Sequence, residues 1–83
     1  MNKWSVYLLR CSDGSLYCGV TNDLQRRVRQ HNAGKGAKYT RTRCPVSLVA
    51  WKSGFKKSEA FRLEVYIKKL PKVKKIPFMR ALG

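Results

Sequence analysis

Acidic side chains are scarce in this sequence. Its 83 residues include 19 Lys and Arg but only 4 Asp and Glu, so the formal net charge at pH 7 is +15. The basic residues run from Lys3 to Arg80 and do not form a tail. A folded domain with this charge repels itself unless it meets a polyanion. We expect nucleic acid, because a dispersed basic surface binds a phosphate backbone through counterion release. An anionic membrane surface is the weaker alternative.

Long apolar runs are also missing. No stretch approaches the roughly 18 residues of a membrane-spanning helix, and no charged segment followed by an apolar core resembles a signal peptide. We therefore expect a cytoplasmic protein with no membrane partner. The three cysteines, Cys11, Cys18 and Cys44, are odd in number and lack paired close spacing. This favours neither a disulfide framework nor a zinc site, and it predicts reduced cysteines that mostly pack as small hydrophobic side chains.

The first half of the chain reads as a hairpin followed by a helix. With 43% hydrophobic residues, a chain this short can build one modest core, which predicts a single domain over residues 1–83. Residues 4–10 and 16–21 are β-branched and aromatic runs on either side of a turn sequence, which predicts a β-hairpin. Asn22, with Gln25 three residues later, resembles a capping box, and the helix is expected to end before a glycine at position 34.

The second half predicts a basic loop, one strand and two helices. Residues 35–43 lack periodicity and are expected to form an exposed basic loop. A third strand is expected over residues 46–51 and is expected to break at Ser53-Gly54. A helix should begin near Ser58, because apolar residues follow it at helical spacing. A last helix could begin at residue 71, and Pro77 is expected to kink or split it.

One face of the helix after the hairpin mixes apolar and polar side chains. At 3.6 residues per turn, one stripe collects Leu24, Arg27, Val28 and His31. A buried guanidinium without a partner is costly, so this stripe should border a polar cleft or an ion partner. Structural interpretations stay open: Arg27 can extend from the edge of the core, and His31 can be a hydrogen-bonded core histidine.

The acids are few enough to assign one by one. Asp13 precedes a glycine in a turn, whereas Asp23 and Glu59 lie in first turns of helices, where carboxylates are stabilising. Glu64 has no such role and falls within the inward-facing arc of its helix. The structural alternative is an ion pair with Lys68, four residues further on.

This scarcity of acids also restricts the chemistry. Nucleases that use two metal ions clamp both with several carboxylates, and this chain has one carboxylate without a structural assignment. Metal-dependent cleavage of a phosphodiester would therefore use one divalent ion, bound by Glu64, waters and the substrate phosphate. Arg27 would stabilise the charge on the phosphate in the transition state.

An ordered set of motifs covers nearly the whole chain: Ser5-Val6-Tyr7, Tyr17-Cys18-Gly19, Thr21-Asn22-Asp23-Leu24, Arg27, His31, Gly36-Ala37-Lys38-Tyr39-Thr40-Arg41 and Glu64. In this order, with a helix after the second motif, the set resembles a short, stand-alone GIY-YIG nuclease domain. The resemblance implies an α/β fold of the α+β type, with a three-stranded antiparallel sheet flanked by helices. It also implies one Mg or Mn ion bound by Glu64. This chain departs from the family pattern at Ser5, Val6 and Cys18, and its last helix has no asparagine.

The resemblance further implies roles for four residues besides Glu64. Arg27 acts on the scissile phosphate, Tyr7 and Tyr17 line the site, and one of these tyrosines or His31 helps to activate water. A tyrosinate base would need Arg27 or the ion to lower its pKa from about 10. Both tyrosines share a face of the sheet only if the hairpin has an odd-numbered loop or a bulge around Gly14.

Two functions of different classes follow. The leading one is a metal-dependent endonuclease that acts on DNA, including nicked, flapped or branched DNA, or on RNA. Lys38, Arg41 and Arg43 would bind backbone phosphates, with a solvated charged surface as the alternative. Since no targeting domain is expected, a protein partner could supply targeting, and DNA repair, recombination and defence all stay open. The second function is a catalytically inactive nucleic-acid-binding module. Glu64 favours the nuclease, whereas the missing asparagine favours the module.

Overall fold

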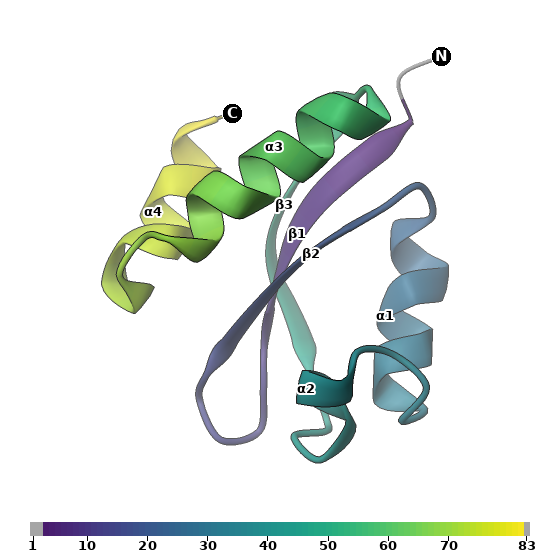
Figure 1. Cartoon of the computed structure of the whole chain (residues 1–83). Helices are drawn as coiled ribbons and strands as arrows, with labels where there is room; N and C mark the ends of the chain where they lie inside the picture. The colour runs from purple at the N-terminus through teal and green to yellow at the C-terminus, as the bar shows by residue number, and fades with distance from the viewer. Residues whose placement is uncertain (1–2, 83) are drawn as a thin grey trace.

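Three strands form one antiparallel sheet in the computed structural model, which describes residues 3–82 (Figure 1). The strands are β1 (Trp4–Arg10), β2 (Leu16–Thr21) and β3 (Ser47–Phe55), in the spatial order β2-β1-β3. The helices are α1 (Leu24–Asn32), α2 (Lys38–Arg41), α3 (Lys57–Lys68) and α4 (Lys72–Ala81). The expected α+β fold is confirmed, and α2 is an addition to the predicted order. In the part of the chain described, no helix is long and apolar enough to cross a membrane.

The turn of the β1–β2 hairpin has three residues, Ser12-Asp13-Gly14. The Cys11 carbonyl accepts a hydrogen bond from the Gly14 amide at 2.9 Å. The Cys11 amide donates a hydrogen bond to the Ser15 carbonyl, also at 2.9 Å. Gly14 has φ +83°, in the left-handed region that glycine adopts without steric cost. The expected odd-numbered loop is therefore confirmed.

This turn sets the register that the site depends on. Tyr7 lies opposite Gly19, and Tyr17 lies opposite Leu9. Because residues two apart on a strand share a face, the side chains of Tyr7, Leu9 and Tyr17 all lie on one side of the sheet. A two-residue turn would have separated the two tyrosines.

The central strand β1 is buried on both faces and divides the interior into two cores. Under α3 and α4, the buried core consists of Val6, Leu8, Cys18, Ala50, Ala60, Ile67 and Met79. On the opposite face, beneath α1, it consists of Tyr7, Leu9, Cys11 and Val46. Cys11 and Cys18 are free and buried, and Cys44 is free and half-buried, which matches the expectation for the cysteines. The candidate site lies on the α1 face.

The N-cap of α1 differs from the prediction. Asp23, and not Asn22, caps the helix, and its carboxylate accepts the Arg26 amide at 3.3 Å. The Asp23 amide in turn donates to the Thr21 hydroxyl at 3.0 Å. The predicted capping box and the assignment of Asp23 to the first turn were therefore wrong, because the backbone at Asp23 lies outside the helix and places its carboxylate against the first turn. The predicted end is confirmed, since Gly34 has φ +74° directly after the C-cap.

β3 does not break at Ser53-Gly54, so this prediction was wrong. Between the pairs made by Trp4 and Val6, two residues of β3 oppose Ser5 alone, which is a β-bulge. Gly54 absorbs the irregularity with φ +96°. Ser53 meets the serine that replaces the motif glycine, with 2.7 Å between the Oγ atoms of Ser5 and Ser53.

Two helical segments also depart from expectation. The segment predicted as an exposed loop contains α2, where Thr40 is fully buried. Pro77 lies inside α4 without splitting it. A proline removes only one amide donor, and Met79 in the same helix is buried in the core under α3 and α4.

Candidate active site

Tyr7, Tyr17 and His31 meet on the α1 face of the sheet. The ring centroids of Tyr17 and His31 are 5.2 Å apart, and those of Tyr7 and Tyr17 are 6.5 Å apart. β1 and β2 position the tyrosines, and α1 brings His31 to them at its last turn. Tyr7 and His31 are fully buried, so this group is the inner wall of the site.

A chain of hydrogen bonds passes through this wall. Tyr7 Oη lies 3.0 Å from His31 Nε2, and His31 Nδ1 lies 2.7 Å from Thr40 Oγ1. The Thr40 hydroxyl donates its single proton to the Ala37 carbonyl at 3.0 Å, so it can only accept from the imidazole. The network therefore assigns the proton of neutral His31 to Nδ1, and Nε2 accepts a hydrogen bond from the Tyr7 hydroxyl.

Burial controls the protonation of both members of this pair. It raises the pKa of Tyr7 to about 12, against the opposing hydrogen bond and charge of Arg27. It lowers the pKa of His31 to about 4, and the nearby charge of Arg27 acts in the same direction. The pKa of Tyr17 is also raised by burial, although Lys68 and Arg27 oppose this. Arg27 alone therefore does not produce the tyrosinate base that the sequence left open.

Two glycines leave space for the side chains of Tyr7 and His31. A Cβ atom on Gly19 would lie 2.5 Å from Tyr7 Oη, and a Cβ atom on Gly36 would overlap the imidazole of His31. Neither Gly36 nor Thr40 stood out as an individual site residue in the sequence, because both fall in the segment expected to be an exposed loop. Only their membership of a motif pointed to them.

Arg27 lies at the outer edge of the wall, half-buried. Its Nη1 donates to Gln30 Oε1 at 3.1 Å, and its charge acts on Tyr7, Tyr17 and His31. The adjacent hollow of about 250 Å³ is lined by Thr21, Asn22, Asp23, Arg26, Arg27 and Gln30. The expectation that this end of the stripe borders a polar cleft is confirmed.

Glu64 comes from α3, whose buried residues belong to the core on the other side of the sheet. Its carboxylate acts electrostatically on Tyr17 and Cys18, two residues of the edge strand β2. The side chain is only 15% exposed, and Oε2 lies 3.4 Å from Nζ of Lys68, whose own side chain is 52% exposed. The predicted inward orientation is confirmed, and the ion pair offered as its structural alternative is also present.

The donor set around Glu64 fits one divalent ion. Across residues 3–82, no group of three or more His, Cys, Asp or Glu side chains could hold a metal ion. A shielded carboxylate whose partner is a half-exposed lysine can exchange that lysine for a hard cation that takes its other ligands from water and phosphate. This donor set excludes an all-protein cage and leaves coordination positions for substrate.

The basic residues predicted to bind phosphate fall into two groups. Lys38 and Arg41 are exposed on α2 and line an open hollow of about 570 Å³. Arg43 also lines it, but its Nε pairs with Asp13 at 3.0 Å and its guanidinium stacks 4.0 Å above the Tyr39 ring. Arg43 thus ties the hairpin turn to α2, whereas Lys38 and Arg41 present their charges to solvent.

The buried histidine predicts that the protein loses stability in weak acid. His31 is the only histidine, with a pKa near 6.5 when unfolded and about 4 when folded. Between these two pH values, His31 is protonated in the unfolded chain but neutral in the folded one. The contribution of His31 to the free energy of unfolding is therefore largest above pH 6.5, and it is lost as the pH drops towards 4. We expect a loss of about 2 kcal/mol between pH 7 and pH 5, measured by urea unfolding. In H31Q this loss should disappear, and an unchanged pH slope would contradict the assignment.

The fold and the residues of the candidate active site define a class of protein. Residues 3–76 match the model of the GIY-YIG catalytic domain, and the chain belongs to this family of nuclease domains. A UPF0213 protein of Nitratidesulfovibrio vulgaris is 48% identical over 80 residues, covering 96% of this chain and 73% of the relative. A UPF0213 protein of Halobacterium salinarum is 56% identical over 70 residues, covering 84% of this chain and 91% of the relative.

Two solution NMR structures resemble this one. The UPF0213 protein BH0048 from Bacillus halodurans has a TM-score of 0.59 and 47% identity, covering 100% of this chain and 87% of that one. The protein EF2693 from E. faecalis has a TM-score of 0.65 and 36% identity, covering 99% of this chain and 91% of that one. Three of these four similar proteins carry the name UPF0213.

Proposed function

We propose that the protein is a metal-dependent endonuclease that hydrolyses phosphodiester bonds in DNA, or in RNA. The observation that carries this proposal is the convergence of opposite charges on Tyr17. The charges of Arg27 on α1 and of Glu64 on α3 both act on its hydroxyl, together with that of Lys68. A surface that only bound phosphate would gain nothing from a shielded carboxylate at this place, whereas a bound cation would need it.

The side chains divide the reaction between them. Arg27 binds the scissile phosphate and stabilises its growing negative charge. Glu64 would hold one Mg or Mn ion, which would supply Lewis-acid charge to the phosphate. Tyr7 Oη accepts a proton from the attacking water as its own proton passes to His31 Nε2. This transfer avoids a free tyrosinate, because Tyr7 is neutral at the start and His31 Nε2, which accepts its hydrogen bond, carries no proton.

The direct test is a cleavage assay with end-labelled substrates. The panel contains single-stranded, duplex, nicked, flapped and branched DNA, and the matching RNAs, with Mg, with Mn or with EDTA. We expect cleavage of at least one substrate that depends on the divalent ion. Salt-sensitive binding of the panel without cleavage of any member would overturn the proposal.

A second candidate is a catalytically inactive nucleic-acid-binding module. The observation that favours it is the ion pair between Glu64 and Lys68, because it satisfies the carboxylate without a metal. The absence of asparagine from α4 points the same way. Asn32 does not replace it, since its side chain is bonded to the backbone of Val46 at 2.7 and 3.1 Å.

Either function predicts a phosphate-binding role for α2. Lys38→Ala and Arg41→Ala should each weaken binding to all sequences alike and make the slope of log K against log salt less negative by about 0.9. Lys57→Ala removes the same charge at the start of α3, where the ammonium lies 5.4 Å from the Trp4 ring centroid, and serves as the control. Fluorescence anisotropy over a salt series measures the slopes. Slopes equal to that of the wild type would reject the role of α2.

A further inference from the structure

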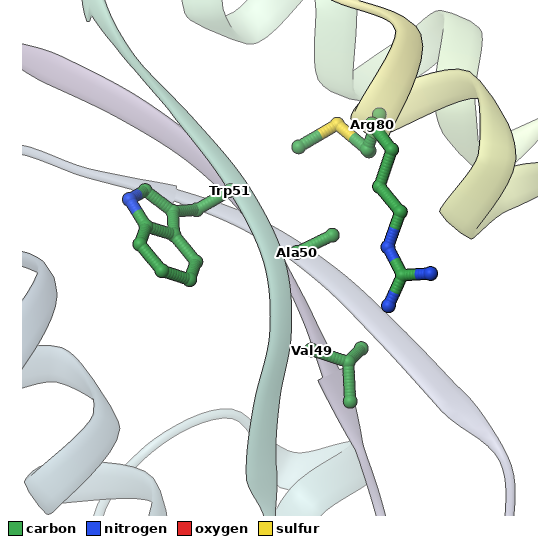
Figure 2. Close-up of a pocket in the computed structure, with 5 residues that line it drawn as sticks. Val49, Ala50, Trp51 and Arg80 are labelled. Carbon is green, nitrogen blue, oxygen red and sulfur yellow. The ribbon is translucent and has the colours of Figure 1, made fainter. Parts of the chain in front are cut away.

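An apolar groove lies between α1 and β3, on the same face of the sheet as the candidate active site. It has a volume of about 650 Å³ and is lined by Leu24, Gln25, Val28, Arg29, Leu48 and Trp51. Trp51 is 54% exposed, although its ring is large and apolar. Figure 2 shows that it projects from β3 on the side opposite to Ala50 and Arg80. The catalytic roles proposed above make no use of this side chain.

The register of the sheet connects the groove to the site. Trp51 lies directly opposite Tyr7 in the pairing of β1 with β3. The two side chains therefore leave neighbouring strands on the same face, and adjacent strands are about 4.8 Å apart. The groove and the hollow beside Arg27 lie on opposite sides of α1. A nucleic-acid strand whose scissile phosphate is beside Arg27 would therefore cross α1 and place a nucleotide further along the strand in the groove.

The chemistry of the groove selects its occupant. Its floor is aliphatic, one wall is the indole of Trp51, and the exposed Arg29 adds a positive charge at the edge. A nucleobase offers a flat apolar face attached to an anionic phosphate, and bases stack on exposed aromatic side chains in this way. A second copy of the chain fits poorly, since two molecules with a charge of +15 each repel one another.

We propose that this groove binds an unpaired nucleobase of the substrate, which stacks on Trp51 while Arg29 contacts the adjoining phosphate. This inference rests on the proposed function, because it assumes that nucleic acid reaches the site. A base inside a duplex cannot enter the groove, as both of its faces are stacked. The preferred substrate class is therefore a nucleic acid with unpaired nucleotides beside the cleavage position, such as a flap or a single-stranded end.

The test measures binding in EDTA, so that it does not depend on cleavage. Two fluorescein-labelled DNA probes contain the same duplex sequence. One probe is blunt, and the other carries a single-stranded extension. From stacking energies, we expect the wild type to bind the extended probe roughly 5- to 150-fold more tightly than the blunt one. Trp51→Ala and Trp51→Leu should abolish this preference without changing affinity for the blunt duplex. Trp51→Phe should retain most of it, because phenylalanine keeps an aromatic face.

A second measurement locates the contact. Trp4→Phe leaves Trp51 as the only tryptophan of the chain. Titration with single-stranded DNA should then quench the tryptophan fluorescence until the signal saturates. Half of this quenching should occur at the DNA concentration that half-saturates the anisotropy signal.

The outcomes separate this inference from the proposed function. If Trp51→Ala keeps the wild-type preference, or if no quenching occurs, base binding in the groove is overturned, while the nuclease proposal stands on its cleavage assay. The groove would then be a surface for a protein segment. If the wild type binds neither probe, both proposals fail.

Discussion

Glu64→Gln is expected to reduce kcat/KM for cleavage by about a thousandfold or more. A bound metal ion contributes several kcal/mol to the stabilisation of transition-state charge, and each 1.4 kcal/mol corresponds to a factor of ten. The amide keeps the shape of the side chain but is a poor ligand for Mg or Mn. Binding of uncleaved DNA should stay equal or become slightly tighter, because a negative charge near the phosphate is removed.

The matched control for this variant is Glu59→Gln. It makes the same chemical change on the same helix, where the Glu59 carboxylate accepts the Lys56 amide at 2.8 Å and caps the first turn. It should lower the melting temperature slightly and leave cleavage unchanged. Mn affinity, measured by calorimetry without DNA, should fall in Glu64→Gln alone. If Glu64→Gln unfolds the protein, the ion pair with Lys68 is the main role of this carboxylate.

Arg27→Ala is expected to reduce kcat by about 10² to 10³, the loss typical of removing one group that stabilises transition-state charge. Arg27→Lys should recover only part of this loss, because an ammonium keeps the charge but not the planar fork that binds two phosphate oxygens. Affinity for uncleaved DNA should fall only modestly in both variants, since many other cations contribute to it. Arg62→Ala, an exposed arginine of α3, controls for the loss of one positive charge.

A spectroscopic measurement distinguishes this role from a structural one. The charge of Arg27 lowers the pKa of His31 and the pKa of Tyr7. In Arg27→Ala both pKa values should therefore rise, and NMR titration of the single imidazole reports the change directly. Lost cleavage with an unchanged pKa of His31 would show that Arg27 does not lie against the Tyr7–His31 pair in solution.

The local patterns predicted much of the fold. β1 and β2 form within the predicted residues, because apolar and aromatic runs on both sides of a turn allow few other structures. The inward stripe of α1 follows from helical periodicity, and so does the inward position of Glu64. The odd-numbered turn at Gly14 followed from a geometric requirement, since both tyrosines had to share a face.

The errors fall where long-range contacts override a local signal. The bulge at Gly54 depends on how β3 pairs with β1, and nothing in the sequence of β3 shows this pairing. Thr40 reads as a polar residue of a basic loop, yet it is buried because its hydroxyl bonds His31, nine residues away. At the start of α1, Asn22 was predicted to be the cap and Asp23 to lie in the first turn, whereas the folded backbone places Asp23 at the cap.

By itself, the sequence determined the excess of positive charge, the hairpin and helix that carry the motifs, and the inward position of Glu64 on its helix. Each of these depends on composition or on neighbours a few residues apart. Only the tertiary structure decided the protonation of Tyr7 and His31, the electrostatic effect of Glu64 on Tyr17, and the place of Trp51 beside Tyr7. The physical reason is that desolvation, charge coupling and strand register arise between segments far apart in the chain, so they exist only after the chain has folded.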